Sequence, residues 1–294
     1  MPAFRPLRQP PGLYHRHVGP ILVTALNDGI ITADFAWLAG LPPDQAEALH
    51  RAAFRAIPPR ITVNAFLLHL PDGSLALIDT GARDSLGPGL GEMPARLAAL
   101  GIAPADIATV LLTHLHPDHA GGLIGADGTA AFPNANLVMH AAEMLFWRDP
   151  ATLAAARDDQ DRAFIALARA VLDAYPGRIR TLSDGAALDG VSAVPLPGHT
   201  PGHTGWRIAS GGDSLLVWGD IVHMPGIQFA RPEIGMGFDI DGAQAIATRR
   251  AIMAAAAARG EAIAGMHLDF PAFGHVAAAG DGYAFIPETW SPLP

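Results

Sequence analysis

Three histidines and an aspartate fall within six consecutive residues of the stretch THLHPDHAGGL at 113–123. They are His114, His116, Asp118 and His119, and they directly follow IATVLLTH (107–114), a short apolar run typical of a buried strand. With 13 histidines in 294 residues, chance is a poor explanation for this cluster. A turn after a strand can aim alternate side chains at one point. The fold must therefore bring the end of this strand to a polar site.

The residue types in the cluster indicate metal binding. Imidazole nitrogens and carboxylate oxygens suit Zn²⁺ and related divalent ions, and Mn²⁺, Co²⁺ or Fe²⁺ would also fit. Four potential ligands in six residues cannot all bind one ion with good geometry, so we expect two ions. The chain has no cysteine, so the other ligands must be histidine, aspartate or glutamate. It also has no lysine, which excludes Schiff-base chemistry and a P-loop.

Three later strands are predicted to end on a further polar residue. His199 follows the strand at 191–196, Asp220 ends SLLVWGD, and His267 ends EAIAGMH. We expect one ion to be held by His114, His116 and His199, and the other by Asp118, His119 and His267. Asp220 is expected to bridge the two ions, together with a water or hydroxide.

Other polar residues are assigned supporting roles. Asp79, in LIDTG at a predicted strand end, is expected to orient a ligand histidine, with turn formation as the alternative. His203, four residues after His199, is expected to stabilise a loop. The remaining histidines are expected to be structural: His15, His17, His50, His69, His140 and His275.

Strands and helices alternate along the chain. Strands are predicted at 21–29, 107–114, 135–140, 191–200, 204–210, 214–220 and 261–267, with a hairpin over 61–81. Helices are predicted at 36–54 (capped by Asp44), 93–102 and 242–260. A single domain over 1–294, an α/β (α+β) four-layer αββα sandwich, accounts for this order. An irregular N-terminal arm at about 1–20 and a helical cap insertion at about 142–175 complete the prediction.

The composition limits which kinds of partner the protein is expected to have. The net charge of −9 argues against a nucleic-acid partner, which usually requires a basic face. No apolar run approaches the roughly 18 residues of a membrane span. The first residues contain no apolar core of a signal peptide, so a cytoplasmic location is expected, although a trimmed exported protein would look the same.

The motifs IDTGA (78–82), THLHPDHAGGL, PGHTPGH (197–203), GDIVH (219–223) and GMHLDFPAFG (265–274) together resemble the metallo-β-lactamase superfamily. The αββα sandwich is the fold of that superfamily. The stretches 86–93, 132–147, 219–232 and 267–276 further resemble its methyl parathion hydrolase-like group, which includes lactonases and arylesterases. This resemblance implies a homodimer with an aromatic pocket over two metal ions.

The resemblance also suggests pocket residues. Phe146 or Trp147, together with Phe164, matches the aromatic lining of that group. Leu86 stands where the phosphotriesterases carry another aromatic residue. His223 stands where many acyl-homoserine lactonases place a tyrosine that holds the lactone carbonyl. His223, with Phe238, looks more like the lactone-hydrolysing relatives, and the alternative is a histidine that only supports the metal rim.

The expected function is opening of lactones, such as an aromatic lactone or an acyl-homoserine lactone, and cleavage of aryl esters. In this mechanism the metal-bridging hydroxide attacks the carbonyl, and Asp220 orients the hydroxide. His223 stabilises the oxyanion, and Asp118 is also predicted to be catalytic. Phosphotriesterase activity could accompany it. The enzymatic alternative is a dedicated organophosphate hydrolase, and the non-enzymatic one is a metal-binding scaffold. Apolar walls favour a small neutral substrate.

Overall fold

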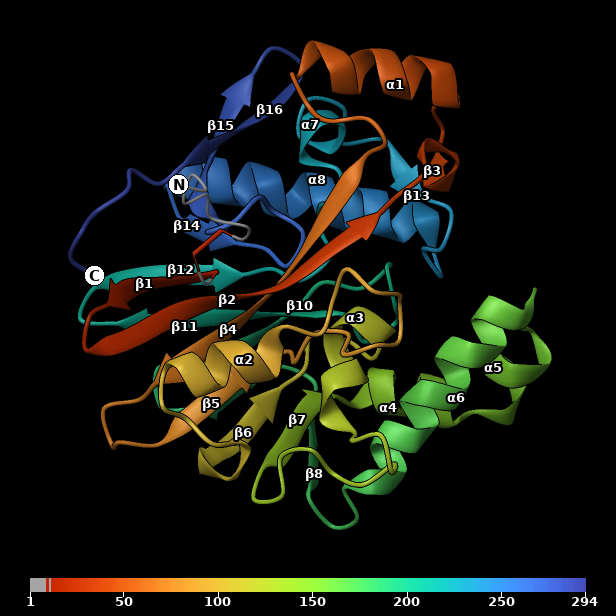
Figure 1. Ribbon diagram of the computed structural model, residues 1–294. Helices are drawn as coiled ribbons and strands as arrows, with labels where there is room; N and C mark the ends of the chain where they lie inside the picture. The colour runs from red at the N-terminus through yellow and green to blue at the C-terminus, as the bar shows by residue number, and fades with distance from the viewer. Residues whose placement is uncertain (1–8, 11) are drawn as a thin grey trace, which may run out of the picture.

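The computed structural model describes residues 9, 10 and 12–294, and two seven-stranded sheets form its centre (Figure 1). The first sheet has the order β1-β2-β4-β5-β6-β7-β8 and the second β16-β15-β14-β12-β11-β10-β9. The first contains β1 (Leu13–Val18), β2 (Ile21–Thr32), β4 (Arg60–His69), β5 (Leu75–Ile78), β6 (Ile107–Leu111), β7 (Asn136–His140) and β8 (Ile179–Leu182). The second contains β9 (Gly185–Leu188), β10 (Val191–Pro195), β11 (Thr204–Ser210), β12 (Asp213–Val217), β14 (Ala262–Ala264), β15 (Phe273–Ala279) and β16 (Gly282–Pro287).

Helices lie outside the two sheets (Figure 1). They are α1 (Pro43–Ala52), α2 (Met93–Ala99), α3 (Pro117–Ala120), α4 (Ala141–Arg148), α5 (Pro150–Ala154), α6 (Asp159–Ala174), α7 (Pro225–Gln228) and α8 (Gly242–Arg259). A two-stranded ribbon pairs β3 (Leu38–Ala39) with β13 (Gly235–Met236). This arrangement confirms the predicted four-layer αββα fold class. Among the described residues, no helix combines the length and apolarity needed to cross a membrane.

Strand β4 shows why the sheets pack in layers. Successive strand residues point to opposite faces, so Phe66 and Leu68 enter the core shared with the second sheet, while Ala65 and Leu67 enter the core under the helices. All four are fully buried. Strand β4 is therefore buried on both faces. Because burial of each large apolar side chain contributes about 1.5–3 kcal/mol to the free energy of folding, the strand stabilises both interfaces.

The polar site lies at the carboxyl ends of strands from both sheets. Strands β5, β6 and β7 run parallel, and β12 runs parallel to β14. The cluster at 114–119, Asp220 and His267 lie just beyond the carboxyl ends of β6, β12 and β14, and their ligand atoms converge.

Some predicted elements were wrong in extent. The helix predicted at 36–54 is a 3₁₀ turn (Phe35–Trp37), then β3, then α1, which begins at Pro43 because proline suits the first helical position. Pro42 occupies the N-cap, and Asp44 lies in the first turn instead. The arm predicted as irregular at 1–20 contains β1, paired with β2, and the rest of the arm falls largely outside the described residues.

The predicted end of the first strand at 29 was also wrong. Strand β2 continues to Thr32 through a register shift between Asn27 and Gly29. A Cβ at Gly29 would lie 2.0 Å from the carbonyl oxygen of Gly89, so this bulge requires glycine. Strands β8 and β9 and the hairpin β15–β16 were not predicted individually.

Candidate metal centre

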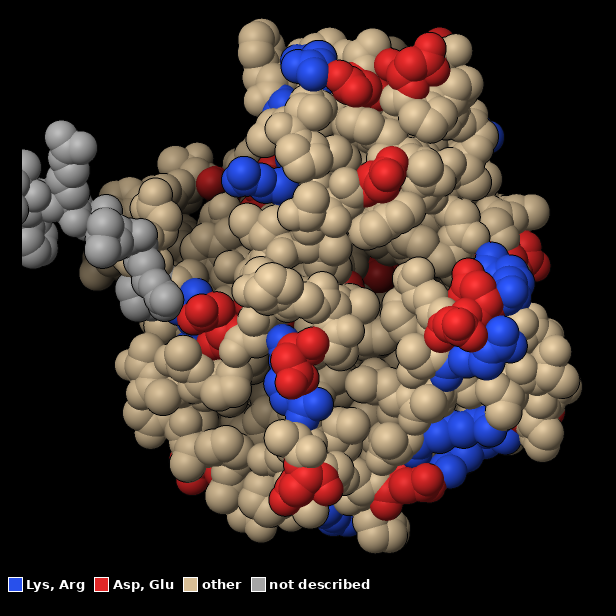
Figure 2. All heavy atoms as spheres, turned by 45° about the vertical axis from the view of Figure 1, so that its right-hand side comes forward, with Lys and Arg blue, Asp and Glu red and all other residues tan. Residues whose placement is uncertain are grey.

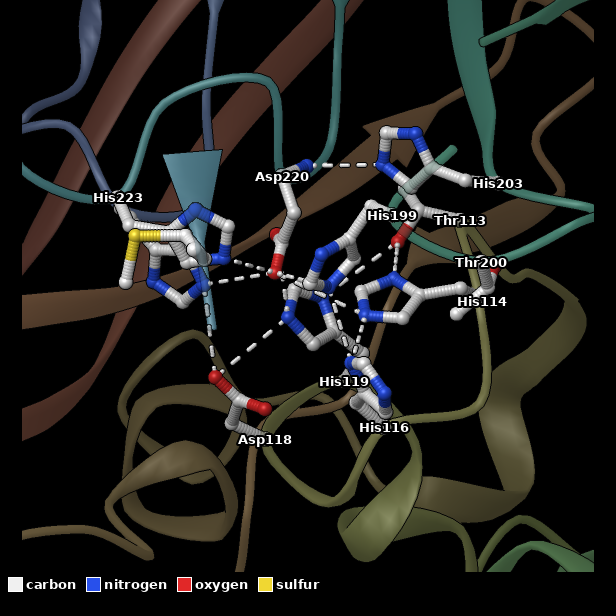
Figure 3. A network of polar contacts seen from close by, with 12 residues as sticks. Thr113, His114, His116, Asp118, His119, His199, Thr200, His203, Asp220 and His223 are labelled. Carbon is white, nitrogen blue, oxygen red and sulfur yellow. Dashed lines mark hydrogen bonds and ion pairs between the residues drawn. The ribbon is translucent and has the colours of Figure 1, made fainter. Parts of the chain in front are cut away.

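The four residues of the 114–119 cluster occupy a turn and a short helix after β6. His114 and His116 lie in the turn, and Asp118 and His119 lie on α3, whose N-cap is His116. His199 comes from the loop between β10 and β11, Asp220 follows β12, and His267 follows β14. Figure 3 shows the labelled side chains converging from these separate elements.

His114, His116 and His199 form one group of converging nitrogens. Nδ1 of His116 lies 2.9 Å from Nε2 of His114 and 2.9 Å from Nε2 of His199. All three rings are buried. Burial and neighbouring histidines hold the pKa values of His114 and His116 well below the usual range, so these rings are neutral and can offer lone pairs.

Asp118, His119 and His267 form a second group. Oδ2 of Asp118 lies 3.5 Å from Nε2 of His119 and 3.5 Å from Nε2 of His267. The three ligand atoms of this group lie within 4.8 Å of one another, and so do those of the first group.

Asp220 lies between the two groups. Its Oδ1 is 3.2 Å from Nε2 of His119, and its Oδ2 is 3.3 Å from Nε2 of His199 and 3.1 Å from Nε2 of His267. Although Nε2 of His119 and Oδ1 of Asp220 are only 3.2 Å apart, they do not form a hydrogen bond with each other. In the described part of the chain, both atoms are buried without any hydrogen-bond partner. Such orphaned polar atoms are costly unless a further group satisfies them. A pair of divalent ions fits this donor set.

Supporting contacts fix which nitrogen of each ring faces the centre. Nδ1 of His119 donates to Oδ2 of Asp79 (2.7 Å), and Nδ1 of His267 donates to the carbonyl of Thr62 (2.8 Å). Because a carboxylate or carbonyl can only accept, each Nδ1 carries a proton, so Nε2 is the nitrogen of each ring that would bind an ion. Asp79 thus contacts His119, and its role in orienting a metal ligand stays a prediction.

Thr113 completes this support at His114. Its backbone N and its hydroxyl donate to the two oxygens of Asp79, at 2.8 and 2.7 Å. Its hydroxyl oxygen lies 3.0 Å from Nδ1 of His114 and, with its own proton given to Asp79, accepts from that nitrogen. Nε2 of His114 is left free to face the centre.

His203 supports Asp220 through the backbone. Its Nδ1 donates to the carbonyl of Leu196 (2.8 Å), and its Nε2 accepts from the backbone N of Asp220 (2.9 Å). Burial, followed by the nearby charge of His199, lowers the pKa of His203 to about 3, so the ring stays neutral. This matches the predicted loop-stabilising role. The histidines predicted to be structural, such as His140, which caps α4, belong to none of the converging groups.

Two buried carboxylates near the site were missed by sequence reasoning. Oδ1 of Asp239 lies 2.8 Å from Nδ1 of His199, and Glu143 on α4 accepts four hydrogen bonds from the ligand loops and a pocket tryptophan. Burial raises the pKa of Glu143, and its four donors oppose that shift. The one sequence signal for either carboxylate was that Asp239 stands next to Phe238, which was predicted to line the pocket.

A pocket of about 850 Å³ opens over the converging groups. His116, Asp118, Asp220 and His267 contribute to its floor. The predicted pocket residues all line it: Leu86, Phe146, Trp147, Phe164, His223 and Phe238. Figure 2 shows the hollow near the centre of this face, with acidic atoms visible inside it.

Aromatic rings flank the centre on two sides. The ring of His116 lies 5.6 Å from Trp147 and 5.7 Å from Phe164. On the other side, Phe238 lies 5.3 Å from His223 and 5.8 Å from His199. The pocket is therefore apolar and aromatic above a polar floor.

His223 reaches this floor. Its Nε2 lies 3.0 Å from Oδ2 of Asp220, and its ring stacks on His267 at 5.0 Å. Burial lowers the pKa of His223 to about 4, against the attraction of Asp220, so the ring is neutral at pH 7. It can donate one hydrogen bond toward the pocket floor.

Comparisons with known proteins give a matching family and a similar solved structure. The family model described as "Metallo-beta-lactamase superfamily" matches residues 58–267. A solved structure, hydrolase AbOPH in the beta lactamase superfamily, is 33% identical, with a TM-score of 0.89 over 97% of this chain and 100% of that one.

Two curated relatives are similar over shorter stretches. The probable metallo-hydrolase Rv2300c of Mycobacterium tuberculosis is 30% identical over 209 residues, 63% of this chain and 64% of the relative. The N-acyl homoserine lactonase AttM of Azorhizobium caulinodans is 33% identical over 130 residues, 42% of this chain and 44% of the relative. The match thus spans less than two thirds of the length of these curated relatives.

Proposed function

Because this chain belongs to the metallo-beta-lactamase superfamily, we propose that it is a metal-dependent hydrolase that opens lactones and cleaves aryl esters. The observation that carries this proposal is the position of Asp220 between two groups of converging ligand atoms at the floor of an apolar pocket. Similarity to an acyl-homoserine lactonase supports the choice of a lactone substrate.

The ligand roles proposed follow the two groups. His114, His116 and His199 would hold one ion, Asp118, His119 and His267 the other, and Asp220 both. The donor set fits two zinc ions and would also accept manganese, cobalt or iron. When bound, the ions supply a nucleophilic hydroxide at neutral pH and polarise the substrate carbonyl.

Side chains of the floor perform the remaining steps. Asp118 and Asp220 both reach the pocket, where they would orient the attacking water and hold its proton. Nε2 of neutral His223 donates to Asp220 in this structure. Once Asp220 holds the ions, this N–H would turn to the carbonyl oxygen and stabilise the negative charge that develops on it. Breakage of the ester or ring C–O bond then releases the alcohol.

The walls favour neutral, apolar substrates. Among the described residues that line the pocket, the one arginine is Arg157, and Asp161 neutralises it through a bidentate pair at 2.8 and 3.0 Å. This lining therefore offers no unpaired arginine to the charged group of a carboxylate or phosphate monoester substrate. Phe146, Trp147 and Phe164 would pack against an aryl or alkyl group.

A neutral phosphotriester would meet the same apolar walls, so weak phosphotriesterase activity is part of the proposal, with a dedicated organophosphate hydrolase as the alternative. The proposal has three further parts. The chain would belong to the methyl parathion hydrolase-like group, form a homodimer, and fold as a single domain with its cap at 142–175. The cap helices α4 and α6 contribute Phe146, Trp147 and Phe164 to the pocket, which supports the role of that segment.

The test compares initial rates of the zinc-loaded protein on an aromatic lactone, a long-chain acyl-homoserine lactone and a dimethyl aryl phosphotriester. His116→Ala serves as the blank. We expect a lactone to give the highest kcat/KM, at least tenfold above the phosphotriester, which is about 1.4 kcal/mol of transition-state discrimination. A higher value for the phosphotriester would favour the organophosphate hydrolase, and rates equal to the blank on all three would refute the proposed substrates.

A further inference from the structure

Glu143 is a buried carboxylate that four donors surround. It lies in the first turn of α4 and is fully buried. Its Oε1 accepts from the backbone N of Leu115 (2.9 Å) and from Nε1 of Trp147 (2.6 Å). Its Oε2 accepts from the hydroxyl of Thr200 (2.6 Å) and from the backbone N of Gly202 (3.2 Å).

These donors belong to both loops that carry the first ligand group. Leu115 lies between His114 and His116, and Thr200 directly follows His199. One carboxylate thus joins the 114–116 turn to the 199–202 loop, which come together from segments more than 80 residues apart.

The backbone packing around Glu143 leaves little freedom. A Cβ on Gly202 would lie 2.2 Å from the backbone N of Glu143, so the 199–202 loop rests directly on the start of α4. Trp147, one helical turn after Glu143, places its ring 5.6 Å from that of His116. The start of α4 therefore serves as a platform under the first group and one wall of the pocket.

The second ligand group has different supports. His119 is held by Asp79, and His267 by the carbonyl of Thr62. Neither contact involves Glu143. Glu143 therefore supports the first group alone, whereas the linked pair Thr113 and Asp79 contacts His114 of the first group and His119 of the second.

We propose that Glu143 is a positioning residue for one ion only, setting the mutual distances of His114, His116 and His199 by tying their two loops together. The inference rests on the proposed two-ion site and adds to it a support that serves the first ion and not the second. A buried carboxylate is kept here because its four charge-assisted hydrogen bonds are hard to replace.

Glutamine cannot make the same set of bonds. If its NH₂ group took the place of Oε1, it would face the N–H groups of Leu115 and Trp147, and neither can accept. If it took the place of Oε2, the hydroxyl of Thr200 could turn to accept, but the N–H of Gly202 could not. Glu143→Gln therefore loses at least one bond between α4 and a ligand loop, with little change in size.

The test is a zinc titration of the full-length protein against a competing chelator, which resolves two release steps. His116→Ala identifies the step of the first ion and His267→Ala that of the second. For Glu143→Gln we expect about 10–100-fold weaker binding at the first step, as for other residues that support metal ligands, with the second step unchanged. Anomalous X-ray diffraction at the zinc edge would show the same selective loss of occupancy.

Glu261→Gln is the matched control. Glu261 is also a largely buried glutamate with several donors, Arg207 and Ser214, but it lies between α8 and β14 and contacts neither ligand loop. We expect both release steps to be unchanged in Glu261→Gln, even if its unfolding temperature falls.

Thr200→Val keeps the test valid if Glu143→Gln does not fold. It removes one donor to Oε2 and should weaken the first step alone, by less than Glu143→Gln. Equal weakening of both steps, or no weakening of the first, in a folded variant would overturn the role of Glu143. Wild-type protein that binds fewer than two zinc ions would instead refute the two-ion site itself.

Discussion

Oδ1 of Asp239 lies 2.8 Å from Nδ1 of His199, and Oδ2 of the same carboxylate accepts from the backbone N of Met236 at 2.9 Å. The contact ties a candidate metal ligand to the loop after β13. Burial works against the charged form of Asp239, but its hydrogen bond to His199 holds the pKa of Asp239 at about 2. Asp239 is therefore ionised at neutral pH and accepts a proton from Nδ1 of His199, so Nε2 is the nitrogen left to bind an ion. Without an ion, burial lowers the pKa of His199, but Asp220 and Asp239 more than offset it and raise this pKa to about 9, so ion binding would displace the proton from Nε2.

Asp239→Asn should weaken zinc binding at the first ligand group. An amide is uncharged and, if its NH₂ group turns toward His199, favours the wrong tautomer of the ring. We expect a 10–100-fold rise in the dissociation constant of one ion, measured by chelator competition at pH 7.5. Asp241→Asn is the control, because Asp241 caps α8 and asparagine caps helices equally well. Equal affinities for wild type and Asp239→Asn would contradict the role assigned to the carboxylate.

Metal removal should lower stability as well as activity. Without ions, several histidines and carboxylates are buried together with orphaned atoms on His119 and Asp220. A ligand at 100 times its dissociation constant stabilises the folded state by about 2.7 kcal/mol. We expect thermal unfolding with excess chelator to occur several degrees lower, with recovery on adding zinc. His116→Ala should show a smaller shift, and an unfolding temperature that ignores the chelator would argue against bound ions.

Stability of the metal-free protein should fall in mild acid, in part through His203. The pKa of this ring is about 3 in the folded chain, because burial and the charge of His199 lower it from 6.5. Between these values the unfolded chain binds the extra proton, so stability is present above pH 6.5 and is lost as pH falls below it. The contribution is about 1.4 kcal/mol for each pH unit in that window.

Urea unfolding of the chelator-treated protein from pH 7.5 to 5.0 measures this effect. His203→Gln should be less stable at pH 7.5, because it loses the bonds to Leu196 and Asp220, but its stability should depend less steeply on pH. The difference between the two slopes should be close to one proton. Parallel pH profiles for the two proteins would show that His203 does not contribute.

The convergence of the candidate ligands could be predicted because their signal is local. His114, His116, Asp118 and His119 are adjacent in sequence, and His199, Asp220 and His267 each follow an apolar strand, so strand order alone predicts that they meet. The fold class followed from the same alternation of strands and helices. The comparisons confirm the superfamily, while the finer assignment to the methyl parathion hydrolase-like group stays a prediction.

The supporting residues could not be predicted, because their roles arise from contacts between distant segments. Glu143 reads as an ordinary acid near the start of a helix, and only the fold brings it to residues 28 and 57 positions away. Helix α1 was placed too early because the apolar period of 36–54 concealed the break at Gly40, where φ is +85°. Local periodicity cannot report such a backbone reversal.

Arg157→Ala should alter substrate binding more than stability. Arg157, in the loop between α5 and α6, pairs with Asp161 and also donates from Nη1 to the carbonyl of Gly237 (3.1 Å). That bond joins the cap to the loop after β13, and both of its residues line the pocket. Because the ion pair is exposed, its loss should change the free energy of unfolding by less than about 1 kcal/mol.

The effect on KM is expected to be larger, because an unfastened cap exposes the apolar walls to water. Loss of one hydrogen bond worth about 0.5–1.5 kcal/mol corresponds to a two- to tenfold higher KM for an aromatic lactone, with kcat nearly unchanged. Arg162→Ala is the matched control, since Arg162 forms a similar exposed pair with Asp159 on α6 but is not among the residues lining the pocket. If both variants raise KM equally, a general loosening of α6 is the cause, and the contact between Arg157 and Gly237 does not hold the cap.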